Sequence, residues 1–274
     1  MIGQTKLLSF IRQMGDNFPR FSIIVGGKGS GKKLLCSEIS KILNITTFNS
    51  GIKADEIRDT IEISYKQKSP KIFLLLDADN MSVVAKNLLL KVLEEPPRNA
   101  YFIMTLTDVA YTLETIKSRG MIFSLDTYSP QELIEYRKLC KFDDKYDYIL
   151  GKICSSTGEV NELFAHGVSD FIDYAKILSD NVGKYPDGLI FKITTRMKSK
   201  DNPNGYNPKI FFRIVMLNFQ ELFRQTQDKL YLEYIKLTAK LIQDLNILAV
   251  NDLASIDNWS MSIREVTEQW NCQV

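Results

Sequence analysis

Apolar runs and amphipathic segments alternate over the first 125 residues of the chain. Five short runs are almost continuously apolar, as expected for strands of a parallel sheet covered on both faces: 21–25, 45–48, 72–76, 101–106 and 121–125. Between them, apolar residues recur at helical spacing in 32–43, 54–66 and 82–94. Strands separated by helices predict a three-layer α/β domain around a parallel five-stranded sheet.

The strand pattern ends near Asp126, and helical patterns replace it. Ser129 followed by Pro130 and Glu132 predicts a helix start, because Ser caps the helix, Pro suits its first turn and Glu bonds back to the cap. Polar, glycine- and proline-rich loops are predicted at 181–187 and 201–208, followed by long amphipathic helices at 209–227 and 229–248. An apolar stripe follows the second helix: Leu230, Tyr234, Leu237, Leu241 and Leu245.

These patterns predict three domains. Residues 1–126 form the α/β domain, 127–178 a small helical domain, and 179–274 a larger all-helical domain. The charge balance changes along the helical part, because residues 126–181 are acidic on balance and residues 182–240 are basic. Four apolar side chains of the 209–227 helix suit either a core or an interface, and burial in a core is the commoner outcome: Phe211, Phe212, Val215 and Phe219.

Composition and charge exclude several classes of protein. With 274 residues, 45% hydrophobic and 25% charged, the chain has the balance of an ordinary globular protein, and its net charge of +2 gives no general sign of nucleic-acid binding. No apolar run suits a signal peptide or a membrane span, so we expect a cytoplasmic protein without membrane contact. Four scattered cysteines and a single histidine, His166, predict neither a disulfide framework nor a zinc or other metal site.

A glycine-rich loop joins the first predicted strand to the first predicted helix. Its sequence from Gly26 to Lys33, GGKGSGKK, fits the phosphate-loop pattern G-x-x-x-x-G-K-[ST] except at the last position. Gly26, Gly29 and Gly31 let backbone amides turn toward a phosphate, and Lys32 would neutralise its charge. A glycine-rich turn unrelated to nucleotides is the alternative.

Two features argue against ATP hydrolysis at this loop. A Ser or Thr at the last position would bind Mg²⁺, but Lys33 carries an ammonium group that cannot bind a metal. The strand at 72–76 leads into Asp77-Ala78-Asp79, where an active enzyme has an adjacent acidic pair that holds Mg²⁺ and positions water. We therefore expect that the loop can hold ATP, ADP or phosphate, and that no cofactor is required.

Motifs downstream of the loop resemble one family. Residues 87–97, NLLLKVLEEPP, resemble the NALLKxLEEPP segment of bacterial clamp loaders and replication factor C subunits. Residues 115–120, TIKSRG, resemble their T-I-x-S-R-C segment, and the N-terminal Ile-Gly-Gln resembles their start. The resemblance covers residues 1–125 and continues more loosely over 129–163. It implies an AAA+ core, a helical lid and a helical C-terminal collar, and within the family it is greatest to delta-prime-type subunits of the DNA polymerase III clamp loader.

The resemblance also assigns positions in the nucleotide site. Counting back from LEEPP places Leu76 at the metal-binding Asp of active subunits and Asp77 at their Glu. Thr107 falls at the sensor-1 position, and Asn161 replaces the sensor-2 arginine that contacts the γ-phosphate. Lys33, Leu76 and Asn161 thus remove metal and phosphate contacts from one site. The four-cysteine zinc module of many relatives is absent from the interval after the loop.

Arg119 is kept although the nucleotide site is altered. In the family, the Arg of S-R-C acts as an arginine finger on the ATP of the neighbouring subunit, and the resemblance implies this role for Arg119, although Gly120 replaces the Cys. A surface ion pair is the alternative role. Glu94 and Glu95 are expected either to contact a neighbouring subunit or to form a solvated helix end.

The resemblance implies a non-hydrolysing subunit of a DNA sliding-clamp loader, which acts as a structural stator and donates an arginine finger. Its partners would be gamma/tau-like ATPase subunits and delta-like subunits, with the sliding clamp and primer–template DNA bound through the assembly. One alternative is an active clamp-loader ATPase, which Lys33 and Asn161 disfavour. Another is a stand-alone DNA-binding module that uses the basic stretch 196–200.

Overall fold

The computed structural model describes residues 2–165, 167–182, 196–197, 205–245 and 251–272. The chain divides into two compact units: the N-terminal unit, Met1–Tyr136 with Ser156–Gly158, and the C-terminal unit, Arg137–Ser155 with Glu159–Val274. Helices α6 (Pro130–Leu139) and α8 (Thr157–Ala165) contribute residues to both units. His166, most of the predicted loops at 181–187 and 201–208, and residues 198–200 of the basic stretch lie outside the described residues.

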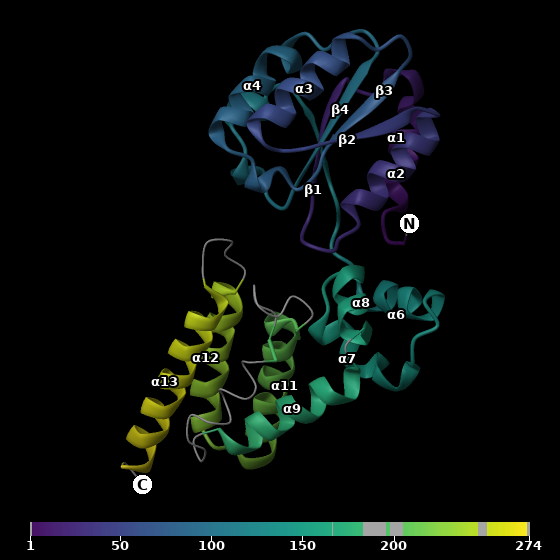
Figure 1. The fold of residues 1–274 in the computed structure, drawn as a ribbon. Coiled ribbons are helices and arrows are strands. Elements are labelled where there is room, and N and C mark those ends of the chain that lie inside the picture. Colours follow the sequence, from purple (N-terminus) through teal and green to yellow (C-terminus); the bar gives the residue numbers. More distant parts are fainter. Residues whose placement is uncertain (1, 166, 183–195, 198–204, 246–250, 273–274) are drawn as a thin grey trace. The chain divides into compact units, whose positions relative to one another are not determined.

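A parallel five-stranded sheet forms the middle layer of the N-terminal unit (Figure 1). The strand order is β2-β3-β4-β1-β5, with these bounds: β1 Phe21–Val25, β2 Thr46–Ser50, β3 Lys71–Leu75, β4 Ala100–Leu106 and β5 Met121–Ser124. Ile23 of β1 pairs with Met104 of β4 on one side and with Ile122 of β5 on the other. All five predicted strands are confirmed, with ends displaced by two residues at most.

Helices cover both faces of this sheet (Figure 1). One face carries α1 (Thr5–Met14) and α2 (Lys32–Leu43), and the other carries α3 (Ala54–Tyr65) and α4 (Val83–Glu94). Successive strand residues point to opposite faces, so Ile24 packs in one apolar cluster with Leu35, and Ile23 packs in the other with Leu89. Burying each of these side chains contributes about 1.5–3 kcal/mol. The predicted three-layer α/β domain is confirmed.

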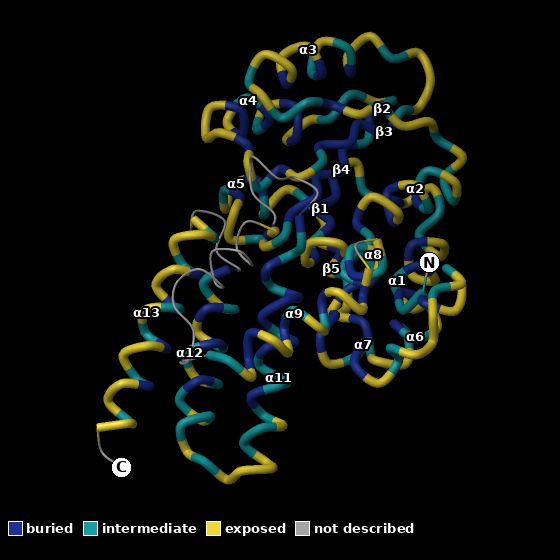
Figure 2. The backbone as a smooth tube through the Cα atoms, turned by 60° about the horizontal axis from the view of Figure 1, so that its bottom comes forward, coloured by how far each residue is buried: buried dark blue, intermediate teal, exposed yellow. Residues whose placement is uncertain are grey.

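The sheet is buried at its centre and exposed at its edges. β1, β3 and β4 are buried along almost their whole length, whereas β2 and β5 leave most of their residues at least partly exposed (Figure 2). Short elements complete the connections: η1 Gly15–Asn17, η2 Ala78–Asn80, η3 Val109–Tyr111, α5 Glu114–Lys117 and η4 Asp144–Tyr146. Since the strands are parallel, the loops after β1, β3 and β4 all lie at the carboxyl ends of the strands. Open α/β sheets bind their ligands at this end.

The predicted helix start at Ser129 is confirmed. The Ser129 backbone N–H donates to the Glu132 carboxylate at 2.7 Å, and the Glu132 N–H donates to Ser129 Oγ at 3.3 Å. Pro130 is the first residue of α6. The reciprocal pair satisfies two backbone donors that a helix start otherwise leaves unpaired.

The C-terminal unit is mainly helical in its described part. Besides the shared α6 and α8 it contains α7 Asp147–Ile153, α9 Val168–Asn181, α11 Pro208–Thr226, α12 Leu230–Asp244 and α13 Asp252–Asn271. The four apolar side chains singled out on α11 are all buried: Phe211, Phe212, Val215 and Phe219. Of the predicted stripe on α12, Tyr234, Leu241 and Leu245 are buried, and Leu230 and Leu237 are half-buried. The expectation that the four apolar side chains of α11 belong to a core is confirmed.

Two hydrogen bonds join α12 to α13. The hydroxyls of Tyr234 and Thr267 lie 2.6 Å apart, and the Trp259 indole N–H donates to Thr238 Oγ1 at 3.1 Å. The sequence patterns predicted two long helices in this region, so α13 is an addition to the predicted architecture. The proposed boundary between residues 127–178 and 179–274 falls inside the C-terminal unit and stays a prediction.

Candidate functional site

The glycine-rich loop joins β1 to α2, as predicted. Gly29 and Gly31 have φ angles of +78° and +94°, a left-handed conformation that only glycine adopts without strain. Gly31 is the N-cap of α2, so the loop leads directly into the positive end of a helix dipole. The backbone thus has the shape and polarity of an anion-binding loop.

Lys32 is folded back onto the loop that precedes it. Its ammonium group donates to the carbonyl oxygens of Gly26 at 2.6 Å and Gly27 at 3.0 Å. The side chain is buried, and this burial lowers the pKa of Lys32, while the nearby carboxylates of Asp79 and Asp77 act in the opposite direction. Lys32 therefore stabilises the conformation of the loop from within the chain.

Lys33 forms an ion pair with Asp77 at 3.1 Å. Asp77 follows β3 in a left-handed conformation, with φ of +54°, and its N–H donates to Thr105 Oγ1 at 2.8 Å. Leu76, the residue predicted to replace the metal-binding Asp, packs against the apolar cluster on the α2 side of the sheet. The charge of the Asp77 carboxylate is therefore already compensated by the Lys33 ammonium group.

Asp79 binds the predicted sensor-1 residue. Its Oδ1 accepts from the backbone N–H of Thr107 at 2.7 Å and from the Thr107 hydroxyl at 2.8 Å. No sequence pattern indicates this role of Asp79, because Asp79 and Thr107 are distant in the sequence and the pairing of β3 with β4 brings their loops together. Thr107 directly follows β4, and its hydroxyl donates to the Asp79 carboxylate.

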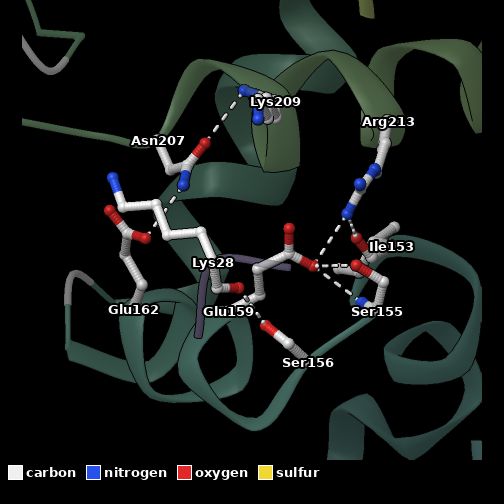
Figure 3. Close-up of polar contacts among 9 residues, drawn as sticks. All are labelled: Lys28, Ile153, Ser155, Ser156, Glu159, Glu162, Asn207, Lys209 and Arg213. Atoms are coloured by element: carbon white, nitrogen blue, oxygen red, sulfur yellow. Dashed lines mark hydrogen bonds and ion pairs between the residues drawn. The ribbon is translucent and has the colours of Figure 1, made fainter. Parts of the chain in front are cut away.

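The segment Ser156–Gly158, which belongs to the N-terminal unit, lies against the loop. The Gly158 N–H and the Thr157 hydroxyl donate to the Gly29 carbonyl at 3.1 and 3.3 Å. The Ser156 hydroxyl donates to the Lys28 carbonyl at 3.2 Å (Figure 3). A Cβ added to Gly158 would lie 2.5 Å from the Gly29 Cα. Two glycines in contact at this point were not anticipated from the sequence.

A second polar cluster belongs to the C-terminal unit and lies around the sensor-2 segment. Arg213 Nη1 donates to the Glu159 carboxylate at 2.9 Å and to the Ile153 carbonyl at 2.6 Å (Figure 3). The backbone N–H of Ser155 donates to the same carboxylate at 2.7 Å. Asn161, predicted at the sensor-2 position, is exposed on α8. The charged pair of this segment thus joins α8 to α11, and no sequence pattern indicates it.

Arg119 follows α5 and is bound within its own chain. Its Nη2 forms an ion pair with Glu94, the last residue of α4, and its Nη1 donates to the Thr115 carbonyl. A Cβ added at Gly120 would lie 2.7 Å from the ring of Phe21, so the chain has no room for the Cys of the family pattern without moving that ring. Glu95 is the exposed C-cap of α4.

Other reactive groups lie apart from this site. Cys36 and Cys154 are buried, which raises the pKa of each thiol to about 12. Among the residues that the structure describes, no group of three or more His, Cys, Asp or Glu could hold a metal ion. No helix within the described ranges is long and apolar enough to cross a membrane.

Comparison with known proteins assigns the N-terminal unit. The family model described as "DNA polymerase III, delta subunit" matches residues 16–129, which include the loop, Thr107 and Arg119. Residues 16–129 form a clamp-loader-type AAA+ domain. The predicted resemblance and the AAA+ fold class are confirmed.

Curated relatives of the clamp-loader type match parts of the chain. DNA polymerase III subunit gamma of Buchnera aphidicola subsp. Acyrthosiphon pisum is 28% identical over 185 residues, 62% of this chain and 51% of that protein. DNA polymerase III subunit delta' of Haemophilus influenzae is 32% identical over 90 residues, 32% of this chain and 28% of that protein. The chain thus spans about half the length of the first relative and less than a third of the second.

Solved structures share the fold at low identity. The Thermotoga maritima RuvB Holliday junction branch migration motor superposes with a TM-score of 0.51 at 14% identity, over 77% of this chain and 88% of that chain. At this identity the likeness concerns the fold alone.

In this clamp-loader-type domain, the side chains that were expected to face a nucleotide form hydrogen bonds or ion pairs with other residues of the same chain. Lys32 binds loop carbonyls, Lys33 binds Asp77, and Thr107 binds Asp79. Amides at a helix start and two ammonium groups can attract phosphate oxygens. Both carboxylates near the site are already paired, so the arrangement suits an anion better than a divalent cation.

Proposed function

We propose that this chain is a non-hydrolysing, delta-prime-type subunit of a DNA sliding-clamp loader. It acts as a structural stator and presents Arg119 to the ATP site of a neighbouring ATPase subunit. The observation that carries the proposal is the 3.1 Å ion pair of Lys33 with Asp77 at the position where a hydrolysing relative would bind Mg²⁺.

The ion pair disfavours catalysis for a simple electrostatic reason. Mg²⁺ requires oxygen ligands in near-octahedral geometry, and an ammonium group both lacks a lone pair and repels the metal. Without Mg²⁺, charge on the transferring phosphoryl group is left without its main stabiliser. Leu76 supplies no metal ligand and Asn161 supplies no cationic contact, so Lys33→Thr alone should not create an active site.

Phosphate binding at the loop is a separate part of the proposal. The left-handed glycines, the α2 N-terminus, Lys32 and Lys33 favour ATP, ADP or phosphate without requiring a cofactor for folding or function. Such binding would be anion binding with no catalytic consequence in this chain.

The proposed partners follow from the curated relatives, which are named as gamma, tau and delta' subunits of DNA polymerase III. We propose gamma/tau-like ATPase subunits and delta-like subunits as direct partners. The sliding clamp and primer–template DNA would then be bound by the assembly, with the helices of the C-terminal unit serving as a collar.

The test is reconstitution with the partner ATPase subunits from the same source. The purified chain alone should hydrolyse no ATP above background. In the assembly, Arg119→Ala should lower the DNA-stimulated ATPase rate by at least about tenfold, since arginine fingers contribute about 10³–10⁵ in rate where the full effect is expressed. An unchanged rate would remove the finger role and would leave Arg119 as a surface ion-pair residue.

A further inference from the structure

We infer that Glu94 is a positioning residue for Arg119, and that it fixes the direction in which the guanidinium group is presented to a neighbouring subunit. This inference rests on the finger role proposed for Arg119. It assigns to the first Glu of the LEEPP segment a function inside the chain, whereas the sequence suggested a contact with a neighbour or a solvated helix end.

The guanidinium group is held from two elements. Glu94, at the end of α4, binds Nη2, and the Thr115 carbonyl in α5 accepts from Nη1. The Arg119 side chain is 29% exposed, so most of it is covered by its own chain, while Glu94 is 52% exposed. A long side chain that would otherwise sample many rotamers is therefore held in one arrangement at the surface.

The backbone that carries Glu94 is well anchored. Val92 and Leu93, which directly precede Glu94, are buried in the core between α4 and the sheet. Glu95 ends the helix, and Pro96 and Pro97 follow with restricted φ angles. The negative end of the α4 dipole adds to the attraction for a cation. The origin of the Glu94 side chain is thus fixed at the end of α4, within reach of the arginine.

The arrangement leaves donors for a ligand. A guanidinium group has five N–H groups, and two of these are used in the intrachain contacts described above. Three remain for phosphate oxygens of a neighbouring nucleotide. Because the planar fork is already oriented, less side-chain entropy is lost when those bonds form, which is the effect expected of a supporting residue around a reacting group.

Glu95 provides a matched control. It is the next residue, carries the same charge and is exposed, and within the described part of the chain it makes no ion pair or side-chain hydrogen bond. General electrostatic effects at this surface would change equally when either glutamate is replaced. An effect specific to Glu94 therefore reports its contact with Arg119.

The experiment uses the full chain assembled with its partner ATPase subunits. DNA-stimulated ATPase is measured for Glu94→Ala, Glu94→Gln, Glu95→Ala, Arg119→Ala and the double variant Glu94→Ala/Arg119→Ala, with thermal unfolding of each chain as the check on folding. Glu94→Ala should lower kcat about fivefold, the size expected for one partly exposed ion pair, with KM for ATP unchanged. Glu94→Gln, which keeps an acceptor, should lie between Glu94→Ala and the parent.

The double variant separates positioning from a structural role. If Glu94 acts through Arg119, replacing it has no further effect once Arg119 is Ala, whereas a merely structural role gives an additional loss. The inference is overturned if Arg119→Ala lowers the ATPase rate but Glu94→Ala leaves it at the parent value. It is also overturned if Glu94→Ala and Glu95→Ala lower the rate equally. If Arg119→Ala itself has no effect, it is the proposed finger role that fails.

Discussion

The glycine-rich loop and the arginine corner, residues 115–120, lie in one unit, but they use their charged groups in different ways. In the loop, Lys32 turns inward to carbonyl oxygens and is buried, and Lys33 pairs with the carboxylate of Asp77. In the corner, Arg119 is also paired, yet its guanidinium group lies at the surface with donors to spare.

Under the proposed function, the difference explains how one half of an ATP site shared between subunits could be lost while the other is kept. A site between subunits takes its phosphate loop from one chain and its arginine from another, so the two halves in a single chain serve different nucleotides. Replacing Ser or Thr by Lys33 affects only the nucleotide of this chain. The arginine corner runs from α5 to β5 and is bonded to α4 through Glu94, so this replacement does not alter it.

The largest effect on stability is expected at the contact between the loop and Gly158. Gly158→Ala places a Cβ 2.5 Å from the Gly29 Cα, so the backbone must shift and the free energy of unfolding should fall by about 1–3 kcal/mol. Gly27→Ala, in the same loop, is the control, because its Cβ would meet nothing within 4 Å. Urea unfolding measures both, and equal values for the two variants would contradict a tight contact at Gly158.

A smaller loss is expected in the corner. Gly120→Cys restores the residue of the family pattern, but its Cβ would lie 2.7 Å from the Phe21 ring, so we expect a loss of about 1–2 kcal/mol. The additional change Phe21→Leu should recover part of that loss by making room. Unfolding free energies of the single and double variants test this, and a Gly120→Cys chain as stable as the parent would mean that packing does not explain the glycine.

The smallest effect concerns the metal dependence of nucleotide binding. Because Lys33 replaces the metal-binding hydroxyl and pairs with Asp77, binding of a fluorescent ADP analogue to the chain should be the same in Mg²⁺ and in EDTA. Lys33→Thr should introduce a Mg²⁺ dependence of less than about tenfold, since Leu76 still supplies no ligand. Clear Mg²⁺ dependence in the parent chain would show that the ion pair yields to the metal.

Much of the N-terminal unit could be predicted because its signals are local. The strand at 21–25 and the helix at 32–43 were predicted at their observed bounds, since continuous apolar runs and a glycine-rich loop mark them clearly. The start of α6 followed from three neighbouring residues. In contrast, α13 was missed because its buried stripe is narrow and includes Thr267 among apolar residues such as Ile256 and Ile263.

The contacts that define the site could not be predicted in the same way. Asp79 with Thr107, Gly29 with Gly158 and Glu94 with Arg119 each join residues far apart in the chain. Their meeting depends on strand order and on how helices pack, and neither is encoded by local spacing. The sequence identified Arg119, Lys33 and Thr107 as residues of interest, and the structure supplies their partners.

The account is tested most directly by comparing one loop variant with one corner variant in the same assembly. DNA-stimulated ATPase is measured for complexes that contain Lys33→Thr or Arg119→Ala in this chain. We predict that Lys33→Thr leaves the rate within about twofold of the parent, and that Arg119→Ala lowers it by at least about tenfold. A complex that depends on Lys33 and tolerates the loss of Arg119 would contradict the account.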